Sequence, residues 1–273
     1  MADDDRLWQW PNHIVMSPSS LKAFGQCKFR NKLRYLQNVD PPDKWIRTFA
    51  MGNATHDALG RIAQQMKVGA SLLTDDQIRF VARMKLPIPE YPSEEARNAD
   101  IELVVQWVRR GQRYLTRLNV EEFLLIEKQE YREFHLFPAR APYKLTAKPD
   151  LIVRRTNSEG EAIIHIIDWK TGSVYPEPDV PVIHRFVTRD KLQEWTGNAS
   201  AAQVQFSWFW LDHGYPDDVD VSVEHCNHAW PGILEQMEAM ATETEWRATP
   251  GWYCRYCPYY QNHCPEEMPP DDR

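Results

Sequence analysis

The chain has 273 residues, of which 42% are hydrophobic and 26% charged, and its formal net charge is −7. The length suits one large domain or two small ones, and the composition excludes a disordered or fibrous protein. No apolar run reaches the roughly 18 residues of a membrane-spanning helix, and the first residues lack a signal-peptide pattern. We therefore expect a cytoplasmic protein without membrane contact.

The negative charge lies mainly at the two ends of the chain. Three consecutive aspartates in the segment 1–16 contribute −3, and the tail 266–273 contributes a further −3. The body, which we expect to be a single domain over 17–265, is therefore close to neutral and has room for a basic groove.

Hydrophobic spacing and capping residues predict four helices in the first 120 residues, over 17–38, 51–67, 74–85 and 95–119. The last two flank a proline-rich break at 85–92, and together they form a helical insert over 71–120.

The pattern then changes to strands, which are expected over 122–136, 143–155, 162–169 and 219–226. Turn residues at 157–160 join the second and third of these into a β-hairpin. An irregular loop is expected over 173–199, and helices over 201–214 and 231–247. This order indicates an α/β core with helical additions.

The predicted hairpin carries acidic and basic residues at one end. Asp150 precedes one strand, and Asp168 and Lys170 end the other on a common face, because side chains alternate along a strand. Carboxylates hold Mg²⁺ or Mn²⁺, and a lysine beside them can orient water or stabilise developing charge. These groups meet the needs of phosphodiester hydrolysis.

Five cysteines are present, and their odd number argues against a disulfide framework. Three of them, Cys254, Cys257 and Cys264, fall within eleven residues near the end of the chain. Such a cluster is typical of a metal site.

Four motifs resemble those of the PD-(D/E)XK nuclease superfamily, in its RecB-like and Cas4-like branch of AddB-type iron–sulfur exonucleases. Pro149-Asp150 followed by Asp168-x-Lys170 matches the P-D-x(n)-(D/E)-x-K signature. Gly52-x-x-x-His56 resembles a helix start whose histidine is a metal ligand. The two remaining motifs are Gln203-x-x-x-Ser207, where tyrosine is usual at the last position, and the opening 17–29, which resembles S-x-S-x-L-x-x-(F/Y)-x-x-C-P, with Lys28 in place of the proline.

The resemblance implies a restriction-endonuclease-like core, a central mixed β-sheet flanked by helices, with the helical insert and a C-terminal four-cysteine cluster added to it. It implies that Mg²⁺ or Mn²⁺ is held by His56, Asp150, Asp168 and the backbone carbonyl of Trp169. Lys170 would position the attacking water, and Gln203 would orient Lys170 or the scissile strand.

The resemblance also makes Cys27 the first of four ligands, the others being Cys254, Cys257 and Cys264. Four thiolates suit either a tetrahedral zinc ion or a [4Fe–4S] cluster, and spacing does not separate the two. The resemblance favours the [4Fe–4S] cluster, which would join the two ends of the domain as a structural staple.

Basic residues interleaved with aromatic ones suit nucleic-acid binding, and we expect it at Lys28, Arg30, Lys32, Arg185 and Arg189. The function predicted is a metal-dependent DNA nuclease, an exonuclease on single strands or DNA ends. The alternative is an inactive nuclease-like subunit that binds DNA or a protein partner in a repair, recombination, replication or CRISPR adaptation complex. A zinc-stabilised interaction domain is a third reading.

Overall fold

The computed structural model describes residues 14–41, 46–88, 91–134, 143–156, 160–172, 174–175, 177–196 and 203–264. The acidic residues 3–5 and the tail 266–273, which carry most of the predicted negative charge, lie outside these ranges.

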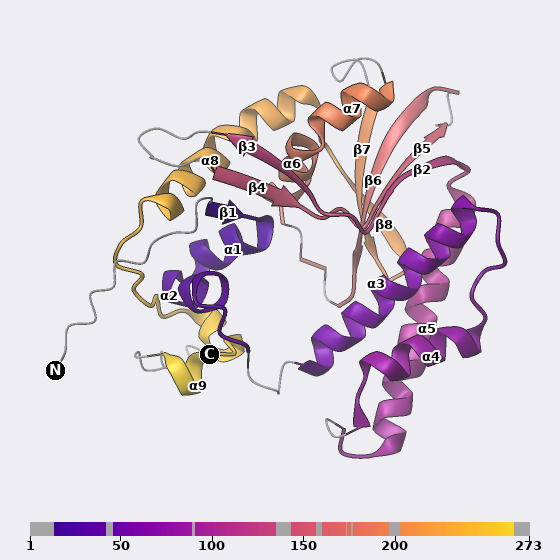
Figure 1. Cartoon of the computed structure of the whole chain (residues 1–273), viewed down its shortest axis with the longest axis horizontal. Helices are drawn as coiled ribbons and strands as arrows, with labels where there is room; N and C mark the ends of the chain where they lie inside the picture. The colour runs from indigo at the N-terminus through magenta and orange to yellow at the C-terminus, as the bar shows by residue number, and fades with distance from the viewer. Residues whose placement is uncertain are drawn as a thin grey trace.

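The centre of the molecule is a five-stranded mixed sheet in the order β2-β5-β6-β7-β8 (Figure 1). Its strands are β2 (Val120–Ile126), β5 (Leu151–Thr156), β6 (Ala162–Lys170), β7 (Gln203–Trp210) and β8 (Tyr215–Val219). β6 and β7 run parallel, and every other neighbouring pair is antiparallel. The central strands pack in a hydrophobic core on each face of the sheet, which explains the nearly continuous apolar sequence of β6.

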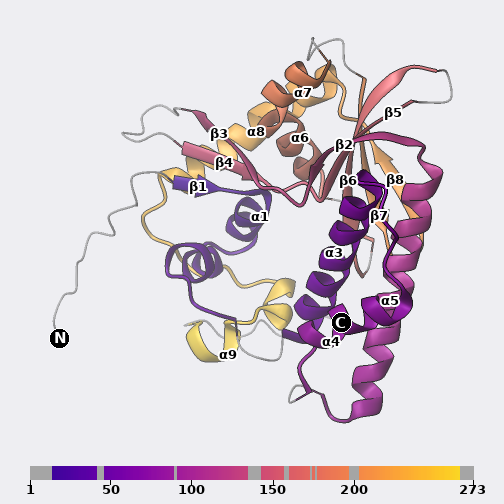
Figure 2. The same cartoon turned by 45° about the vertical axis from the view of Figure 1, so that its right-hand side comes forward.

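Three helices cover one face of this sheet: α3 (Ile46–Lys67), α4 (Asp75–Lys85) and α5 (Glu94–Arg117). Thr74 caps α4 and Ser93 caps α5, each by accepting a hydrogen bond from a backbone N–H group. Their apolar faces share one core with sheet residues such as Ile167, Trp169 and Phe209. Figure 2 shows α3 and α5 side by side along the sheet.

The opposite face is covered by α6 (Asp179–Val187) and α7 (Arg189–Thr196), which pack on side chains such as Phe206 and Trp208. A small second sheet, in the order β1-β4-β3, lies beside them. It consists of β1 (Ile14–Met16), β3 (Glu130–Phe134) and β4 (Tyr143–Ala147), and it shares a core with α8 (Val223–Ala241).

The two ends of the described chain meet. The first helices are α1 (Pro18–Gln26), α2 (Lys28–Asn31) and the π-helix η1 (Lys32–Leu36), and the last are the 3₁₀-helix η4 (Trp252–Tyr256) and α9 (Tyr260–His263). The Tyr259 hydroxyl donates to the Val39 carbonyl at 2.7 Å, and the Phe29 N–H donates to the Arg247 carbonyl at 3.3 Å. Both views show these segments together (Figures 1 and 2).

The structure confirms the predicted α/β core, a mixed sheet flanked by helices. It also confirms helices at 51–67, 74–85 and 95–119 and the hairpin of β5 and β6, although α3 begins five residues earlier than predicted. The predicted helix over 17–38 is divided at Cys27, whose backbone is extended and whose sulfur caps α2 by accepting the Arg30 N–H.

The prediction of a helix over 201–214 is wrong, because residues 203–210 form β7. Phe206, Trp208 and Trp210 pack on one face of the sheet and Phe209 on the other. A strand buried on both faces loses its polar alternation, and a short apolar run then resembles a buried helix. The dense aromatic residues were the available signal for a strand.

Three other boundaries differ from prediction. The expected loop over 173–199 contains α6 and α7, because Pro181 lies in the first turn of α6, where its missing N–H costs nothing. The strand expected over 219–226 ends at Val219, and α8 begins at Val223, capped by Ser222. The predicted strands 122–136 and 143–155 are each two strands, which belong to different sheets.

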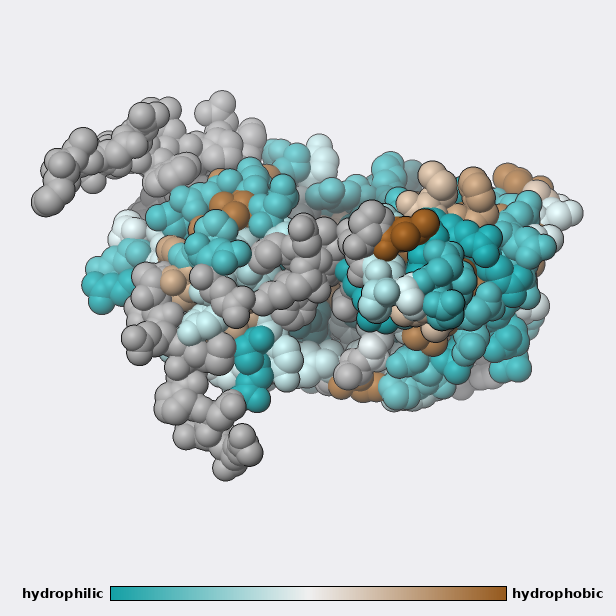
Figure 3. All heavy atoms as spheres, turned by 90° about the horizontal axis from the view of Figure 1, so that it is seen from below, coloured by the Kyte–Doolittle hydropathy of each residue, from teal (hydrophilic) through white to brown (hydrophobic). Residues whose placement is uncertain are grey.

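Within the described ranges, no helix is both long and apolar enough to cross a membrane. The face shown in Figure 3 is mainly hydrophilic, and its hydrophobic residues occur in small groups.

Candidate active site

Asp150 lies between β4 and β5, where the chain passes from the small sheet to the large one. Pro149 precedes Asp150. The Asp150 carboxylate accepts a hydrogen bond from the Trp169 N–H at 2.7 Å. Its own carbonyl accepts from the Glu127 N–H at 2.8 Å. Asp150 therefore fixes the ends of β2, β5 and β6 relative to one another, and its side chain is only 9% exposed.

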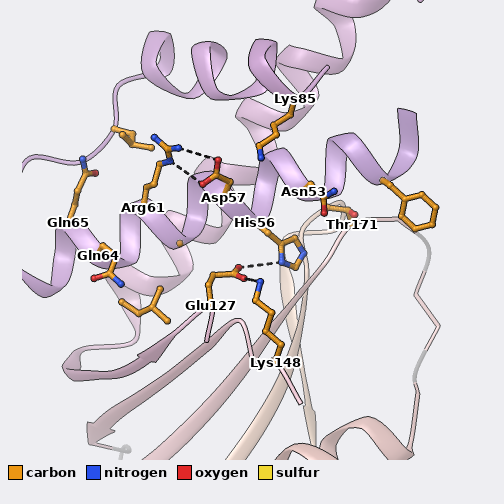
Figure 4. A pocket seen from close by; sticks show the side chains of 15 residues that line it. Asn53, His56, Asp57, Arg61, Gln64, Gln65, Lys85, Glu127, Lys148 and Thr171 are labelled. Atoms are coloured by element: carbon orange, nitrogen blue, oxygen red, sulfur yellow. Dashed lines mark hydrogen bonds and ion pairs between the residues drawn. The ribbon is translucent and has the colours of Figure 1, made fainter. Parts of the chain in front are cut away.

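His56 from α3 completes this group. Its Nδ1 atom lies 3.0 Å from one Asp150 oxygen and 3.6 Å from Glu127 Oε1. The ligand atoms of His56, Glu127 and Asp150 all lie within 4.8 Å of one another. Figure 4 shows His56 and Glu127 facing each other, with Lys148 beside Glu127.

The charges of the group are strongly coupled. Burial would lower the pKa of His56, but Asp150 and Glu127 outweigh it and raise that pKa to about 10. Burial raises the pKa of Asp150, and the negative charges of Asp168 and Glu127 act in the same direction. A cluster of buried carboxylates with one proton-holding histidine is an arrangement that a divalent cation would stabilise by replacing that proton.

The donor set fits such an ion. Glu127 Oε1 is buried and accepts no hydrogen bond from the described part of the chain, although it points into the group. Its other oxygen lies 2.6 Å from Lys148 Nζ. One imidazole nitrogen and several carboxylate oxygens are ligands that suit Mn²⁺ or Mg²⁺.

Asp168 and Lys170 lie on the neighbouring strand β6. Lys170 Nζ is 3.0 Å from Asp168 Oδ1 and 4.4 Å from the centre of the Trp208 ring. Burial alone would lower the pKa of Lys170, but Asp168, Glu177 and Asp150 outweigh it and raise that pKa. Lys170 therefore keeps its positive charge beside the carboxylates.

The structure places Gln203 too far from Lys170 to orient it. Gln203 begins β7 opposite Ile163, whereas Lys170 lies opposite Trp210 at the other end of the same pair of strands. Seven residues of strand separate the two positions by about 23 Å. The Gln203 amide donates instead to Glu161 at 2.5 Å.

None of the predicted DNA-binding residues lines the cleft beside His56. Lys28 pairs with Glu243, Arg30 donates to Gln26 at 3.1 Å, and Lys32 lies on η1. Arg185 and Arg189 line a separate groove between α6 and α8. The cleft beside His56 is lined by other residues, among them Arg61, Lys85 and Lys148.

The four predicted cysteine ligands are brought together from the two ends of the chain. Cys27, Cys254, Cys257 and Cys264 line one small cavity. The sulfur of Cys27 accepts from the Arg30 N–H at 3.5 Å, and that of Cys254 accepts from the Gly251 N–H at 3.3 Å. Backbone N–H groups directed at sulfur suit thiolate ligands. Cys226, the remaining cysteine, is half-buried on α8, where a strand was expected.

Glu127 and Lys148 are residues of this site that the predicted set of site residues does not include. Glu127 directly follows the apolar strand β2 and has a φ of 49°, in the left-handed region that a residue with a side chain rarely occupies. Such strain is retained where the surrounding structure imposes it, often at functional sites. An acidic residue at the end of an apolar strand was the available signal.

The chain is similar in sequence to a known protein family. The model of the PD-(D/E)XK nuclease superfamily matches residues 15–265. Curated proteins give no match. Among solved structures, the chain is similar to the crystal structure of SSO0001, with 16% identity, a TM-score of 0.33 and coverage of 81% of this chain and 97% of that one. It is also similar to protein VC1899 from Vibrio cholerae, with 14% identity, a TM-score of 0.22 and coverage of 79% and 55%. The family match spans nearly all described residues, and the chain belongs to the PD-(D/E)XK nuclease superfamily.

Proposed function

We propose that the protein is a metal-dependent deoxyribonuclease that hydrolyses phosphodiester bonds in single-stranded DNA or at DNA ends. The observation that carries this proposal is the group of His56, Glu127 and Asp150, whose ligand atoms lie within 4.8 Å, next to the pair of Asp168 and Lys170 on β6. Superfamily membership supports nuclease chemistry at this position.

His56, Glu127 and Asp150 would hold Mg²⁺ or Mn²⁺, with Asp168 and the Trp169 carbonyl as further candidate ligands. The bound ion supplies Lewis acidity towards phosphate oxygens and water. Lys170 keeps its proton because of Asp168, so it donates hydrogen bonds to water or to a phosphate oxygen instead of accepting a proton. The Trp208 ring limits where the ammonium group lies.

The test is cleavage of end-labelled single-stranded and double-stranded DNA with Mn²⁺. Wild type is compared with Lys170→Ala and with Lys67→Ala, which removes an exposed lysine at the end of α3. We expect wild type and Lys67→Ala to cut and Lys170→Ala to lose at least a hundredfold in rate. Binding without cutting by all three would favour the inactive DNA-binding subunit.

Asp150→Asn separates loss of metal from loss of fold. An asparagine side chain can still accept the Trp169 N–H bond but lacks the charge that a divalent ion needs. We expect calorimetric Mn²⁺ binding to be lost while the far-ultraviolet circular dichroism stays that of wild type. Unchanged Mn²⁺ affinity would remove Asp150 from the ligand set.

We also propose that the four cysteines hold a [4Fe–4S] cluster. Their convergence in one cavity and the N–H groups directed at two of the sulfurs support a thiolate site, which zinc would also suit. Protein purified without oxygen is analysed for iron, sulfide and zinc, with Cys226→Ser as the matched control for Cys254→Ser. Zinc in place of iron and sulfide would refute the cluster.

A further inference from the structure

A cleft of about 1040 Å³ extends from the metal-ligating group along one face of α3. The helix residues that line it recur every three or four positions, so they form a single stripe: Phe49, Gly52, Asn53, His56, Asp57, Gly60, Arg61, Gln64 and Gln65. From Phe49 to Gln64 the stripe is about 22 Å long, which is the length of roughly six stacked nucleotides.

The far wall of the cleft comes from the helical insert. Lys85, in the last turn of α4, lines the cleft and is directed towards α3 (Figure 4). Lys85 is exposed and forms no ion pair with any residue in the described ranges, whereas Arg61 is paired with Asp57 at 3.1 Å and Lys148 with Glu127 at 2.6 Å. Its charge is therefore available to an anionic ligand.

The N-terminal end of the stripe carries an aromatic side chain, that of Phe49. Phe49 is 45% exposed although it is large and apolar, and the guanidinium group of Arg34 lies 5.7 Å from its ring. An exposed ring beside an arginine is a surface on which a base of any identity can stack.

The acidic groups lie deep in the molecule. The side chains of Asp150 and Asp168 are 9% and 10% exposed, whereas that of His56 is 30% exposed. A phosphodiester must therefore enter the recess between α3 and the end of the sheet, which a flexible single strand does more readily than a stiff duplex.

Building on the proposed nuclease function, we propose that a single nucleic-acid strand lies along this stripe of α3, with a base stacked on Phe49 and a phosphate bound by Lys85. This assigns the predicted insert of residues 71–120 a role as one wall of the substrate channel. The amides of Asn53 and Gln64 supply neutral contacts along the same path.

The test is binding of a fluorescein-labelled 12-nucleotide single strand, measured by anisotropy with Ca²⁺ at several salt concentrations. Lys85→Gln is compared with Lys67→Gln, which removes the same charge from an exposed position outside the cleft. We expect Lys85→Gln to weaken binding roughly three- to tenfold and to reduce the slope of log K against log salt by about 0.7. A slope equal to that of wild type would overturn the role of Lys85.

Phe49→Leu tests stacking separately. It should weaken binding of the ordinary strand by about tenfold and leave binding of a strand without bases unchanged. Equal losses for the two strands would refute stacking, and a duplex that binds as tightly as the single strand would refute the strand preference.

Failure of the channel and failure of the nuclease function give different results. If the chain cuts DNA but Lys85→Gln has the KM and salt dependence of wild type, only the channel is wrong. If no metal supports cutting but the substitutions of Lys85 and Phe49 weaken binding as expected, the proposed channel is supported and the proposed nuclease function is refuted.

Discussion

His165, at the centre of β6, should make the protein sensitive to mild acid. It is fully buried, and Arg155 Nε donates to its Nδ1 atom at 3.0 Å. Its proton must therefore be on Nε2, which lies 2.6 Å from Ser207 Oγ; that hydroxyl in turn donates to Asp218. Burial, assisted by the charge of Arg155, lowers the pKa of His165 to about 3.

The sign and size of the effect follow from this pKa. An unfolded histidine has a pKa of about 6.5, so below that pH the unfolded chain takes up a proton that folded His165 refuses. The contribution to stability is present above pH 6.5 and is lost as the pH falls towards 3. Between pH 7.5 and pH 4.5 the loss is about 2.5 kcal/mol, a large part of a typical free energy of unfolding.

The comparison uses His165→Gln, whose amide keeps a donor for Ser207 but does not titrate, and His213→Gln, which changes an exposed histidine. The free energy of unfolding is measured by urea titration with tryptophan fluorescence at both pH values. His184 is also buried, with a pKa lowered to about 4, and its effect is common to all three proteins and cancels in the comparison. We expect His165→Gln to lose about 2.5 kcal/mol less on acidification than the other two. Equal losses would refute the reasoning.

Three further predictions concern packing and the cysteine site. Gly60→Ala should favour the helix by up to about 1 kcal/mol but weaken Mn²⁺ affinity in calorimetry, because the new Cβ would lie 3.1 Å from Glu127 Cγ. Unchanged affinity would show that Glu127 moves freely. Gly111→Ala should destabilise the protein by about 1–3 kcal/mol in urea titration, since its Cβ would come within 2.7 Å of the buried Leu59 side chain. Cys254→Ser should lose the bound metal and lower Tm, whereas a wild-type melting curve with full metal content would exclude a structural role for the site.

The sequence predicted those elements whose pattern is local. The β5–β6 hairpin was found because branched apolar residues flank turn residues. The helix over 74–85 was also predicted, and in the structure Thr74 and Gln77 cap α4 reciprocally. β7 was missed because burial on both faces removes the alternation that marks a strand. The role of Gln203 came from the resemblance to the Q-x-x-x-Y motif, and the strand β7 places Gln203 at the end remote from Lys170.

Residues of the candidate site were predicted only where they belong to a sequence motif. His56, Asp150, Asp168 and Lys170 were identified by their motifs. Glu127 was not in the predicted ligand set, and its position in the group depends on contacts distant in sequence. Its N–H is held by the Asp150 carbonyl, and its side chain by Lys148. The extended path of the substrate along α3 depends in the same way on α4, which no motif connects to the active site.

Asp150 explains why the metal site and the break between the two sheets coincide. In a single strand over 143–155 the side chain of residue 150 would point to the same face as Ile152, opposite the face that α3 covers. Pro149 has no N–H to donate, so pairing stops there and the chain passes from β4 to β5. The carboxylate is thereby free to accept the Trp169 N–H and to face His56, and the carbonyl to hold Glu127. The proline is thus as much a part of the site as the aspartate, because it ends one sheet where the ligands of three elements must meet.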